Sequence, residues 1–266
     1  MKIKVFTAFS GYDSQCMALD MLKQEYESFD YELVGWSEID SNAIKLHNLF
    51  YPQWADRNFG DVMKIDWEQV PDFDLFTYSF PCQSISTAGL QHGLTEGSGT
   101  RSSLLWECKK AISIKHPKIC LMENVKALTG KKFMPQFQLW LDFLESEGYT
   151  NFWQVMNARN YEIPQNRERV FCVSVLNCEK PYVFPAPIPL DKCLGDMLDD
   201  EDTIPRNFYI DQDKVEQFVK VNEKKLHEVM ALDLPQPTSM ESANACEGGG
   251  DGSYSDPKWI KIEPKK

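Results

Sequence analysis

The chain has 266 residues, and with 42% of them hydrophobic it can bury the core of one large α/β domain, or of one domain and part of a second. The formal net charge of −12 argues against a nucleic-acid-binding surface that is basic over the whole chain, although local basic patches are compatible with it. No apolar run is long enough to span a bilayer, and the N-terminus lacks the apolar core of a signal peptide, so we expect a cytoplasmic protein.

The eight cysteines are scattered along the chain. They form no C-x-x-C pair and have no histidine spacing that suits zinc, so we predict no metal site. We interpret all of them except Cys82 as packing or incidental thiols in a reducing compartment.

The first predicted unit is a strand, a turn and a helix. An apolar strand at residues 4–9 leads into a turn at residues 10–14. The next helix has Ser14 as its predicted cap and carries one apolar face, formed by Met17, Ala18, Met21 and Leu22. This order is typical of nucleotide-binding α/β units, in which loop amides and the helix N-terminus face the ligand. The signal is weak alone, because Gly11 is the only glycine of the turn.

Two acidic residues follow at predicted strand ends. A second strand at residues 31–36 leads to Glu38, whose carboxylate could accept hydrogen bonds from ribose hydroxyls; a solvated loop acid is the equal alternative. A helix capped at residues 40–42 runs to Phe50. Asp61 lies in a short loop before the third strand and could bind an adenine amino group, although Gly-Asp pairs are most often simple turns.

The third strand covers residues 74–78 and stops at Pro81, which has no N–H for the sheet. Cys82 is therefore placed just past the carboxyl end of a strand, where ligands bind in open α/β sheets. A lone cysteine is most often a buried structural thiol, so this position needs support from other residues. Residues 86–100 are predicted to form a loop beside Cys82, and residues 101–115 a helix.

Later strands supply that support. A buried strand at residues 119–123 ends abruptly in Glu123, and a helix over residues 133–147 and a strand over residues 152–156 follow. Arg167 and Arg169 lead into the strand at residues 170–175. The alternation of apolar strands with helices predicts an α/β fold with a doubly wound, mostly parallel sheet covered on both faces.

Four of these side chains lie at or next to strand ends, and we expect them at one edge of one sheet: Cys82, Glu123, Arg167 and Arg169. A thiolate can add to an electron-poor ring while an acid binds a ring nitrogen and an arginine holds an exocyclic oxygen. A nucleotide-like cofactor beside them could then deliver a group to the activated carbon.

Three blocks carry a resemblance to a known family. The blocks closely resemble motifs of the cytosine-5 DNA methyltransferases, and their order and their spacing of about 40 residues match that family too. They are Phe80-Pro81-Cys82-Gln83-Ser84, Met122-Glu123-Asn124-Val125 and Gln165-Asn166-Arg167-Glu168-Arg169. The resemblance covers about residues 3–176 and implies a Rossmann-like fold that uses S-adenosylmethionine. It also implies a bacterial or phage-encoded enzyme of DNA methylation and restriction-modification.

The resemblance assigns roles to individual residues. Cys82 would add to carbon 6 of a cytosine flipped out of duplex DNA, and Glu123 would contact N3 and the exocyclic amine. Arg169, assisted by Arg167, would contact the base or support the covalent intermediate, and carbon 5 would take the methyl group. The implied S-adenosylmethionine contacts are Phe9, Ser10, Gly11, Glu38, Ile39, Asp61, Val62 and Pro81.

The sequence departs from the family pattern at two places. Asp13 stands where the family's second turn glycine usually is. Its β-carbon and charge could narrow the cofactor site or repel the carboxylate of the cofactor, so we expect weaker cofactor binding. After about residue 210 we find neither a full target-recognition domain nor the closing motifs of the family. We therefore expect a catalytic and cofactor-binding domain at residues 1–189 and a partial target-recognition region at residues 190–266.

Three explanations fit the missing recognition domain and closing motifs. The chain could be an engineered fragment, the product of a truncated gene, or one subunit of a split enzyme whose second chain carries the missing lobe. Two alternatives to a DNA methyltransferase also stay open. A branch of the same family methylates tRNA, and a remnant with an impaired site could serve as a binding module. An unrelated thiol enzyme is a distant fourth reading, because no histidine stands in a block suited to activate Cys82.

Overall fold

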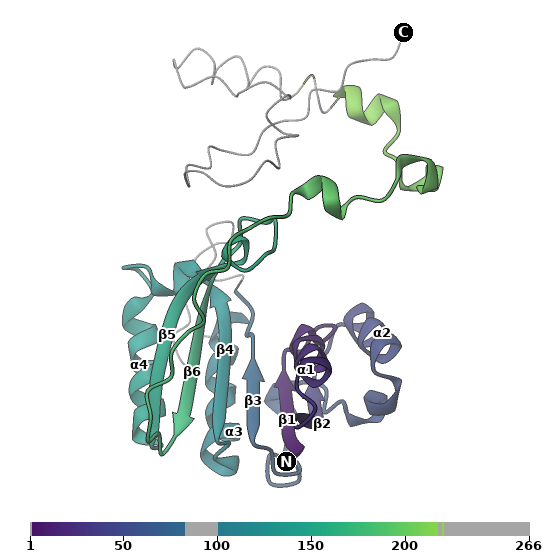
Figure 1. Ribbon diagram of the computed structural model, residues 1–266. Helices are drawn as coiled ribbons and strands as arrows, with labels where there is room; N and C mark the ends of the chain where they lie inside the picture. The colour runs from purple at the N-terminus through teal and green to yellow at the C-terminus, as the bar shows by residue number, and fades with distance from the viewer. Residues whose placement is uncertain (1, 83–100, 218–219, 221–266) are drawn as a thin grey trace. The chain divides into compact units, whose positions relative to one another are not determined.

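The computed structural model of the chain describes residues 2–82, 101–217 and 220 (Figure 1). The chain divides into two compact units. The first unit holds Met1–Ala158 and Asn166–Pro187, and the second holds Arg159–Gln165 and Ile188–Lys266. The loop predicted at residues 86–100 lies outside the described residues.

The described part of the first unit is organised around one six-stranded sheet with the order β2-β1-β3-β4-β6-β5. Its strands are β1 (Lys2–Ala8), β2 (Asp30–Ser37), β3 (Leu75–Tyr78), β4 (Ile119–Val125), β5 (Tyr149–Asn157) and β6 (Glu168–Leu176). The neighbours from β2 to β4 pair in parallel, whereas β6 is antiparallel to both β4 and β5. The prediction of a mostly parallel sheet is confirmed, and the reversed direction of β6 is a feature that hydrophobic periodicity did not predict.

Helices cover both faces of this sheet (Figure 1). The α-helices are α1 (Ser14–Glu25), α2 (Ser41–Phe50), α3 (Cys108–Lys115) and α4 (Met134–Ser146). Successive strand residues point to opposite faces, so Val5 packs in one apolar cluster with Cys16 of α1, and Phe6 packs in another with Phe137 of α4. The two clusters are the two cores of a doubly wound fold.

Short 3-10 helices connect these elements: η1 (Pro52–Arg57), η2 (Val62–Lys64), η3 (Arg101–Glu107), η4 (Lys126–Thr129) and η5 (Ala158–Asn160). The helix predicted over residues 101–115 is split, with the tighter η3 leading directly into α3. The helix predicted over residues 133–147 and the strand predicted over residues 152–156 are present as α4 and as the longer β5.

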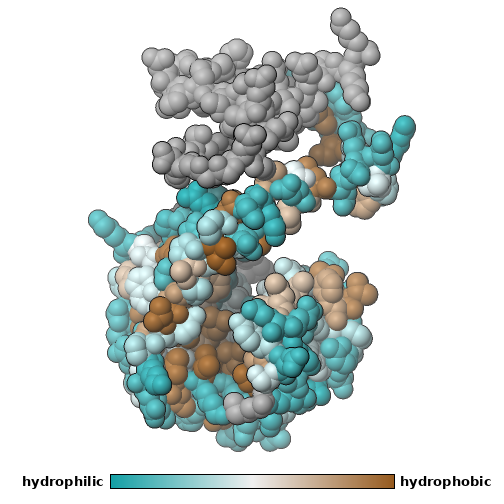
Figure 2. All heavy atoms as spheres, in the orientation of Figure 1, coloured by the Kyte–Doolittle hydropathy of each residue, from teal (hydrophilic) through white to brown (hydrophobic). Residues whose placement is uncertain are grey.

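The face of α1 that packs on the sheet differs from the predicted one. Asp13 caps the helix in place of Ser14, and Cys16 and Leu19 then point into the core. The predicted apolar face lies outward instead, where Met21 is 68% exposed. In Figure 2 more apolar surface gathers over α2, where Leu49 and Phe50 are exposed.

The second unit has little regular structure in its described residues. It contains the 3-10 helices η6 (Leu194–Met197), η7 (Glu201–Thr203) and η8 (Arg206–Phe208), and residues 212–217 are helical. A single bridge pairs Tyr161 with Ile188, whose backbone N–H donates to the Asn160 carbonyl at 2.7 Å.

Candidate active site

Chain direction brings three of the predicted blocks to one edge of the sheet. β3 and β4 run parallel, so the segment after β3 that carries Cys82 and the carboxyl-terminal half of β4 lie at the same edge. β6 runs the other way and begins there, which places Arg169 opposite Val125 in the register of β4 and β6. Glu123 lies opposite Phe171, so Arg169 is its diagonal neighbour on the same face of the sheet.

Glu123 and Arg169 form an ion pair. The distance between Arg169 Nε and Glu123 Oε1 is 3.1 Å, and the side chains are 24% and 26% exposed for Arg169 and Glu123 respectively. Burial raises the pKa of the Glu123 carboxyl, while the charges of Arg169 and Arg167 and a hydrogen bond from Ser79 oppose that rise. The effect of burial is the larger one, so the pKa of Glu123 stays above that of an exposed glutamate. The two arginines favour the charged carboxylate and limit the rise.

The segment that carries Cys82 is held from two sides. Asn124 of β4 donates its side-chain N–H to the Phe80 carbonyl at 2.9 Å, and the Ser102 hydroxyl donates to the Pro81 carbonyl at 2.7 Å. Cys82 itself is half-buried against the larger core cluster. The backbone beside the thiol is therefore anchored, and the thiol keeps partial access to solvent.

Four other cysteines are more deeply buried than Cys82. Cys16, Cys108, Cys120 and Cys172 are buried in the core, and burial raises the pKa of each thiol, to about 11 for Cys172. These thiols stay protonated and pack as apolar groups. Cys178 and Cys193 are half-buried like Cys82, and Cys246 lies outside the described residues.

The turn after β1 has left-handed backbone at Phe9 and Gly11, with φ of 56° and 59°. Ser10 ties this turn to the end of β2, since its N–H donates to the Ser37 carbonyl at 3.1 Å. The N–H of Gly11 donates to Glu38 Oε2 at 2.9 Å. A Cβ added at Gly11 would meet no atom within 4 Å, so the outer side of this turn is open to a ligand.

Glu38 is fixed by three backbone donors. Its Oε1 accepts from the N–H groups of Ile39 and Asp40 at 2.7 and 2.8 Å, and its Oε2 accepts from Gly11. The neighbouring Ile39 is 71% exposed. A preorganised carboxylate beside an uncovered apolar side chain is suited to bind hydroxyl groups next to a flat ring.

Asp61 and Val62 lie in the third loop of the same region. The Asp61 carboxylate caps η2, with Oδ1 accepting from the Met63 N–H at 3.1 Å. The Ser37 hydroxyl donates to the Gly60 carbonyl at 2.6 Å and so ties this loop to β2. The Val62 side chain packs in the core, so it offers a ligand its backbone alone.

Asp13 does not act as the sequence suggested. Its backbone is left-handed, with φ of 67°, and its side chain is completely buried. One oxygen accepts from the Thr7 hydroxyl at 2.8 Å, and the other accepts from the Cys16 N–H at 3.3 Å, at the start of α1. The expectation that this side chain narrows the cofactor site is wrong, because the αL backbone turns it inward under the turn.

Sequence reasoning also missed four polar side chains beside the site: Gln15, Ser79, Ser102 and His47. None of them belongs to the three sequence blocks that indicated the family. Each makes a polar contact with a residue far away in sequence. Asn124 was available as a signal, because it follows Glu123 at a position that alternates to the buried face of β4.

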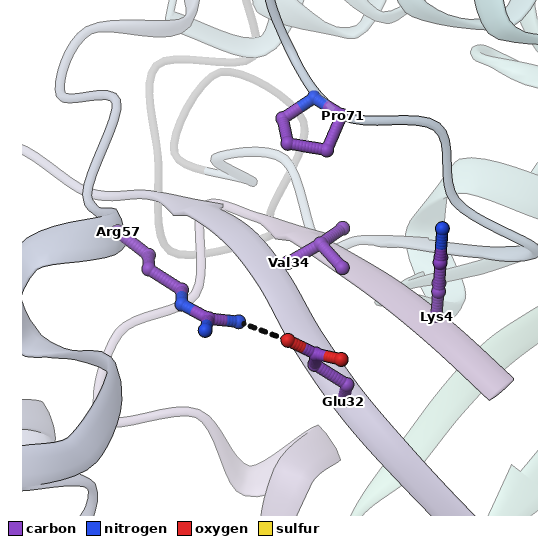
Figure 3. A pocket seen from close by; sticks show the side chains of 5 residues that line it. All are labelled: Lys4, Glu32, Val34, Arg57 and Pro71. Carbon is purple, nitrogen blue, oxygen red and sulfur yellow. Dashed lines mark hydrogen bonds and ion pairs between the residues drawn. The ribbon is translucent and has the colours of Figure 1, made fainter. Parts of the chain in front are cut away.

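An open hollow of about 430 Å³ lies elsewhere on the first unit (Figure 3). It is lined by Lys4, Glu32, Val34, Arg57 and Pro71, and Arg57 Nη1 lies 2.9 Å from Glu32 Oε1. None of the predicted site residues lines it. Within the described ranges no cluster of His, Cys, Asp and Glu suits a metal ion, and no helix is long and apolar enough to cross a membrane.

The fold and this edge together define an α/β enzyme for group transfer, with a cysteine, a carboxyl group and arginines beside a turn suited to a nucleotide-like cofactor. The model of the C-5 cytosine-specific DNA methylase family matches residues 3–247, and the chain belongs to this family. The members named below are methyltransferases, so the predictions of this family and of an enzyme are confirmed.

Two named relatives are informative. The Type II methyltransferase M2.ScrFI of Lactococcus lactis subsp. cremoris is 39% identical over 264 residues, with 80% of this chain and 71% of the relative covered. The orphan methyltransferase M.SssI of Spiroplasma monobiae is 31% identical, with 76% and 67% covered.

Two solved structures share the fold. The Entamoeba histolytica methyltransferase EhMeth superposes with a TM-score of 0.63 at 16% identity, over 80% of this chain and 64% of its own. The S. pombe Dnmt2 methyltransferase gives 0.53 at 18% identity, over 68% and 52%. The Rossmann-like architecture is thereby confirmed, and this chain spans about half to two thirds of the length of these solved proteins.

Proposed function

We propose that this chain transfers a methyl group from S-adenosylmethionine to carbon 5 of a cytosine in duplex DNA. The observation that carries the proposal is the half-buried Glu123 carboxyl group, paired with Arg169 at 3.1 Å at the sheet edge that also holds the anchored segment with Cys82. Family membership supports S-adenosylmethionine as the methyl donor and DNA as the substrate. The Type II name of the Lactococcus relative supports a restriction-modification setting.

In this mechanism the cytosine is flipped out of the duplex, because its ring carbons are not accessible within the stack. The Cys82 thiolate adds to carbon 6, and the ring electrons move toward carbon 5. Glu123 holds N3 and the exocyclic amine, and Arg169, with Arg167, stabilises the charge that develops on the ring. After carbon 5 is methylated, a base removes its proton and the carbon–sulfur bond to Cys82 breaks.

The cofactor residues fit S-adenosylmethionine by their donor and acceptor chemistry. The fixed Glu38 carboxylate suits ribose hydroxyls, the exposed Ile39 suits one face of a purine, and Asp61 suits its amino group. The open turn at Phe9, Ser10 and Gly11 supports contact with the amino-acid end of the cofactor. The cofactor supplies the methyl group, and Pro81 and Val62 complete the proposed lining through backbone atoms.

We assign residues 1–189 to catalysis and cofactor binding and residues 190–266 to part of a target-recognition region. The division of the chain after Pro187 supports this boundary, and the second unit also takes in Arg159–Gln165. A second chain that carries further recognition elements stays a prediction, which the subunit composition of the complex purified from its source organism tests.

The test is methyl transfer from labelled S-adenosylmethionine to a panel of duplex DNAs, with tRNA offered in parallel. We expect transfer to DNA and a complete loss in Cys82→Ala. Cys178→Ala is the matched control, because Cys178 is also half-buried but lies away from the strand ends that form the site. Transfer to tRNA alone, or activity that survives in Cys82→Ala, would overturn the proposal.

A further inference from the structure

We propose that Ser79, held by Gln15, positions the Glu123 carboxyl group, so that the first turn of α1 and the proposed base-binding residue act as one unit. This inference rests on the proposed function for the role of Glu123. It concerns two residues that lie outside the chemical motifs, Gln15 on the cofactor side and Ser79 at the end of β3.

Strand register brings Ser79 to Glu123. Tyr78 and Met122 are direct partners in the parallel pair of β3 and β4, and both are buried. Side chains alternate along strands, so Ser79 and Glu123, one residue further on, both point to the opposite face. The register therefore sets the Ser79 hydroxyl beside the Glu123 carboxyl group, where a donor lowers the pKa of that carboxyl.

Gln15 sets the direction of that hydroxyl. Its side-chain Nε2 donates to Ser79 Oγ at 3.2 Å, although the two residues are 64 positions apart in sequence. Its Oε1 accepts from the Ser14 hydroxyl at 3.3 Å, which orients the amide with its nitrogen toward Ser79. Because Ser79 Oγ accepts from Gln15, its single proton is free to be donated to Glu123.

The surroundings of Glu123 make this hydrogen bond important. The charged groups that face the carboxyl are Arg169 of β6, at 3.1 Å, and Arg167, just before that strand. Both approach from the β6 side, and Ser79 approaches from the β3 side. The carboxyl is thus flanked from both neighbouring strands, by arginines on the β6 side and by Ser79 on the β3 side.

A purely structural role is the alternative reading, in which Ser79 and Gln15 only join α1 to the strand end. The two readings differ in what they predict for the protonation of Glu123. A structural link changes the stability of the fold, whereas a positioning residue changes the pKa of the carboxyl group that it touches.

The experiment is a pH titration of the full chain labelled with ¹³C at the glutamate carboxyl carbons, with the Glu123 signal assigned by its absence in Glu123→Gln. We expect Ser79→Ala to raise the pKa of Glu123 by about one pH unit, because a hydrogen bond to the charged form is lost. Ser79→Thr keeps a hydroxyl and restores the wild-type titration. Gln15→Ala raises the pKa by less, since the Ser79 hydroxyl remains but is no longer oriented.

The matched control is Ser113→Ala, which removes a serine hydroxyl bonded to another glutamate, Glu147, at 2.9 Å. It leaves the titration of Glu123 unchanged. A second control is Gln138→Ala, since the Gln138 amide is also on a helix and donates to Asp142 at 2.8 Å. If Ser79→Ala titrates like wild type, or if the effects of Gln15→Ala and Ser79→Ala add in the double variant, the proposal is overturned.

Methyl transfer gives a separate readout. We expect Ser79→Ala to lower kcat about tenfold while the KM for S-adenosylmethionine changes less than about twofold. If the wild-type chain transfers no methyl group to any nucleic acid, the proposed function fails, but the titration still decides whether Ser79 and Gln15 position Glu123.

Discussion

The imidazole Nε2 of His47 on α2 lies 3.5 Å from Oδ2 of Asp13, and both side chains are completely buried. His47 also stacks on Trp36 of β2, with ring centroids 3.7 Å apart. Neither Nδ1 nor Nε2 has a hydrogen-bond partner among the residues that the structure describes, so the approach to Asp13 is a close polar contact. The contact therefore joins the turn after β1 to α2, the helix that follows the loop of Glu38. The two proposed cofactor loops are thus connected through one buried polar contact.

Asp13→Gly tests this contact. Glycine adopts the φ of 67° without strain, so the variant removes the side chain and not the backbone conformation. We expect the free energy of unfolding to fall by about 1–3 kcal/mol, because Thr7 and the Cys16 N–H lose a buried acceptor. Urea denaturation measures this change.

Calorimetry on the same variant measures the effect on the cofactor. The Asp13 side chain points away from the open side of the turn, so Asp13→Gly does not strengthen S-adenosylmethionine binding. Tighter binding would show that the Asp13 charge does act on the cofactor. Asp20→Ala, a substitution within α1, is the control for losing an aspartate in this region, since Asp20 accepts from the Tyr31 hydroxyl at a part-buried position.

Glu123 makes stability depend on pH. Burial raises its pKa in the folded chain above the ordinary 4.5, so between 4.5 and that raised pKa the folded state binds more protons than the unfolded state. The contribution of Glu123 to stability is thus most favourable below pH 4.5 and declines as the pH rises through this window. The difference in unfolding free energy between wild type and Glu123→Gln, followed by urea denaturation at a series of pH values, reveals this slope. A difference that stays flat across the window would contradict the raised pKa.

Glu38→Gln tests the cofactor loop. The amide keeps a single acceptor oxygen, whereas the carboxylate of Glu38 accepts from Gly11, Ile39 and Asp40 through two. We expect S-adenosylmethionine affinity to fall at least about tenfold, measured by calorimetry. The matched control is Glu32→Gln on β2, the strand that Glu38 follows, which breaks only the ion pairs of Glu32 with Lys2 and Arg57. Equal losses in the two variants would argue against a cofactor role for Glu38.

Asn124→Ala tests the anchor of the cysteine segment. Asn124 is buried, donates to the Phe80 carbonyl and accepts from the Val125 N–H at 2.9 Å. We expect a loss of about 2 kcal/mol in unfolding free energy and, below the melting range, a fall in methyl transfer of at least about tenfold. Asn151→Ala removes a comparable bond, to the Leu141 carbonyl at 3.0 Å, and leaves transfer intact at temperatures where the variant is folded. Equal activity in the two variants would contradict the anchoring role.

Much of the fold was predictable because local patterns report burial. The apolar strands and the amphipathic α4 follow from periodicity, and β3 ends at Tyr78, shortly before Pro81. The catalytic and cofactor residues stay predictions, and they were reached from three short blocks and their order. The direction of β6 was not predictable in this way, since an apolar strand reads alike in both directions.

The amino-acid sequence by itself determined which residue types stand at strand ends, and it pointed through Cys82, Glu123 and Arg169 to the right family. Only the tertiary structure decided where side chains point. The left-handed backbone turned Asp13 inward to His47, the reversed β6 set Arg169 beside Glu123, and the register of β3 and β4 set Ser79 there too. The physical reason is that local patterns record burial and period, whereas a contact between residues distant in sequence depends on chain direction, register and packing, which only the folded chain defines.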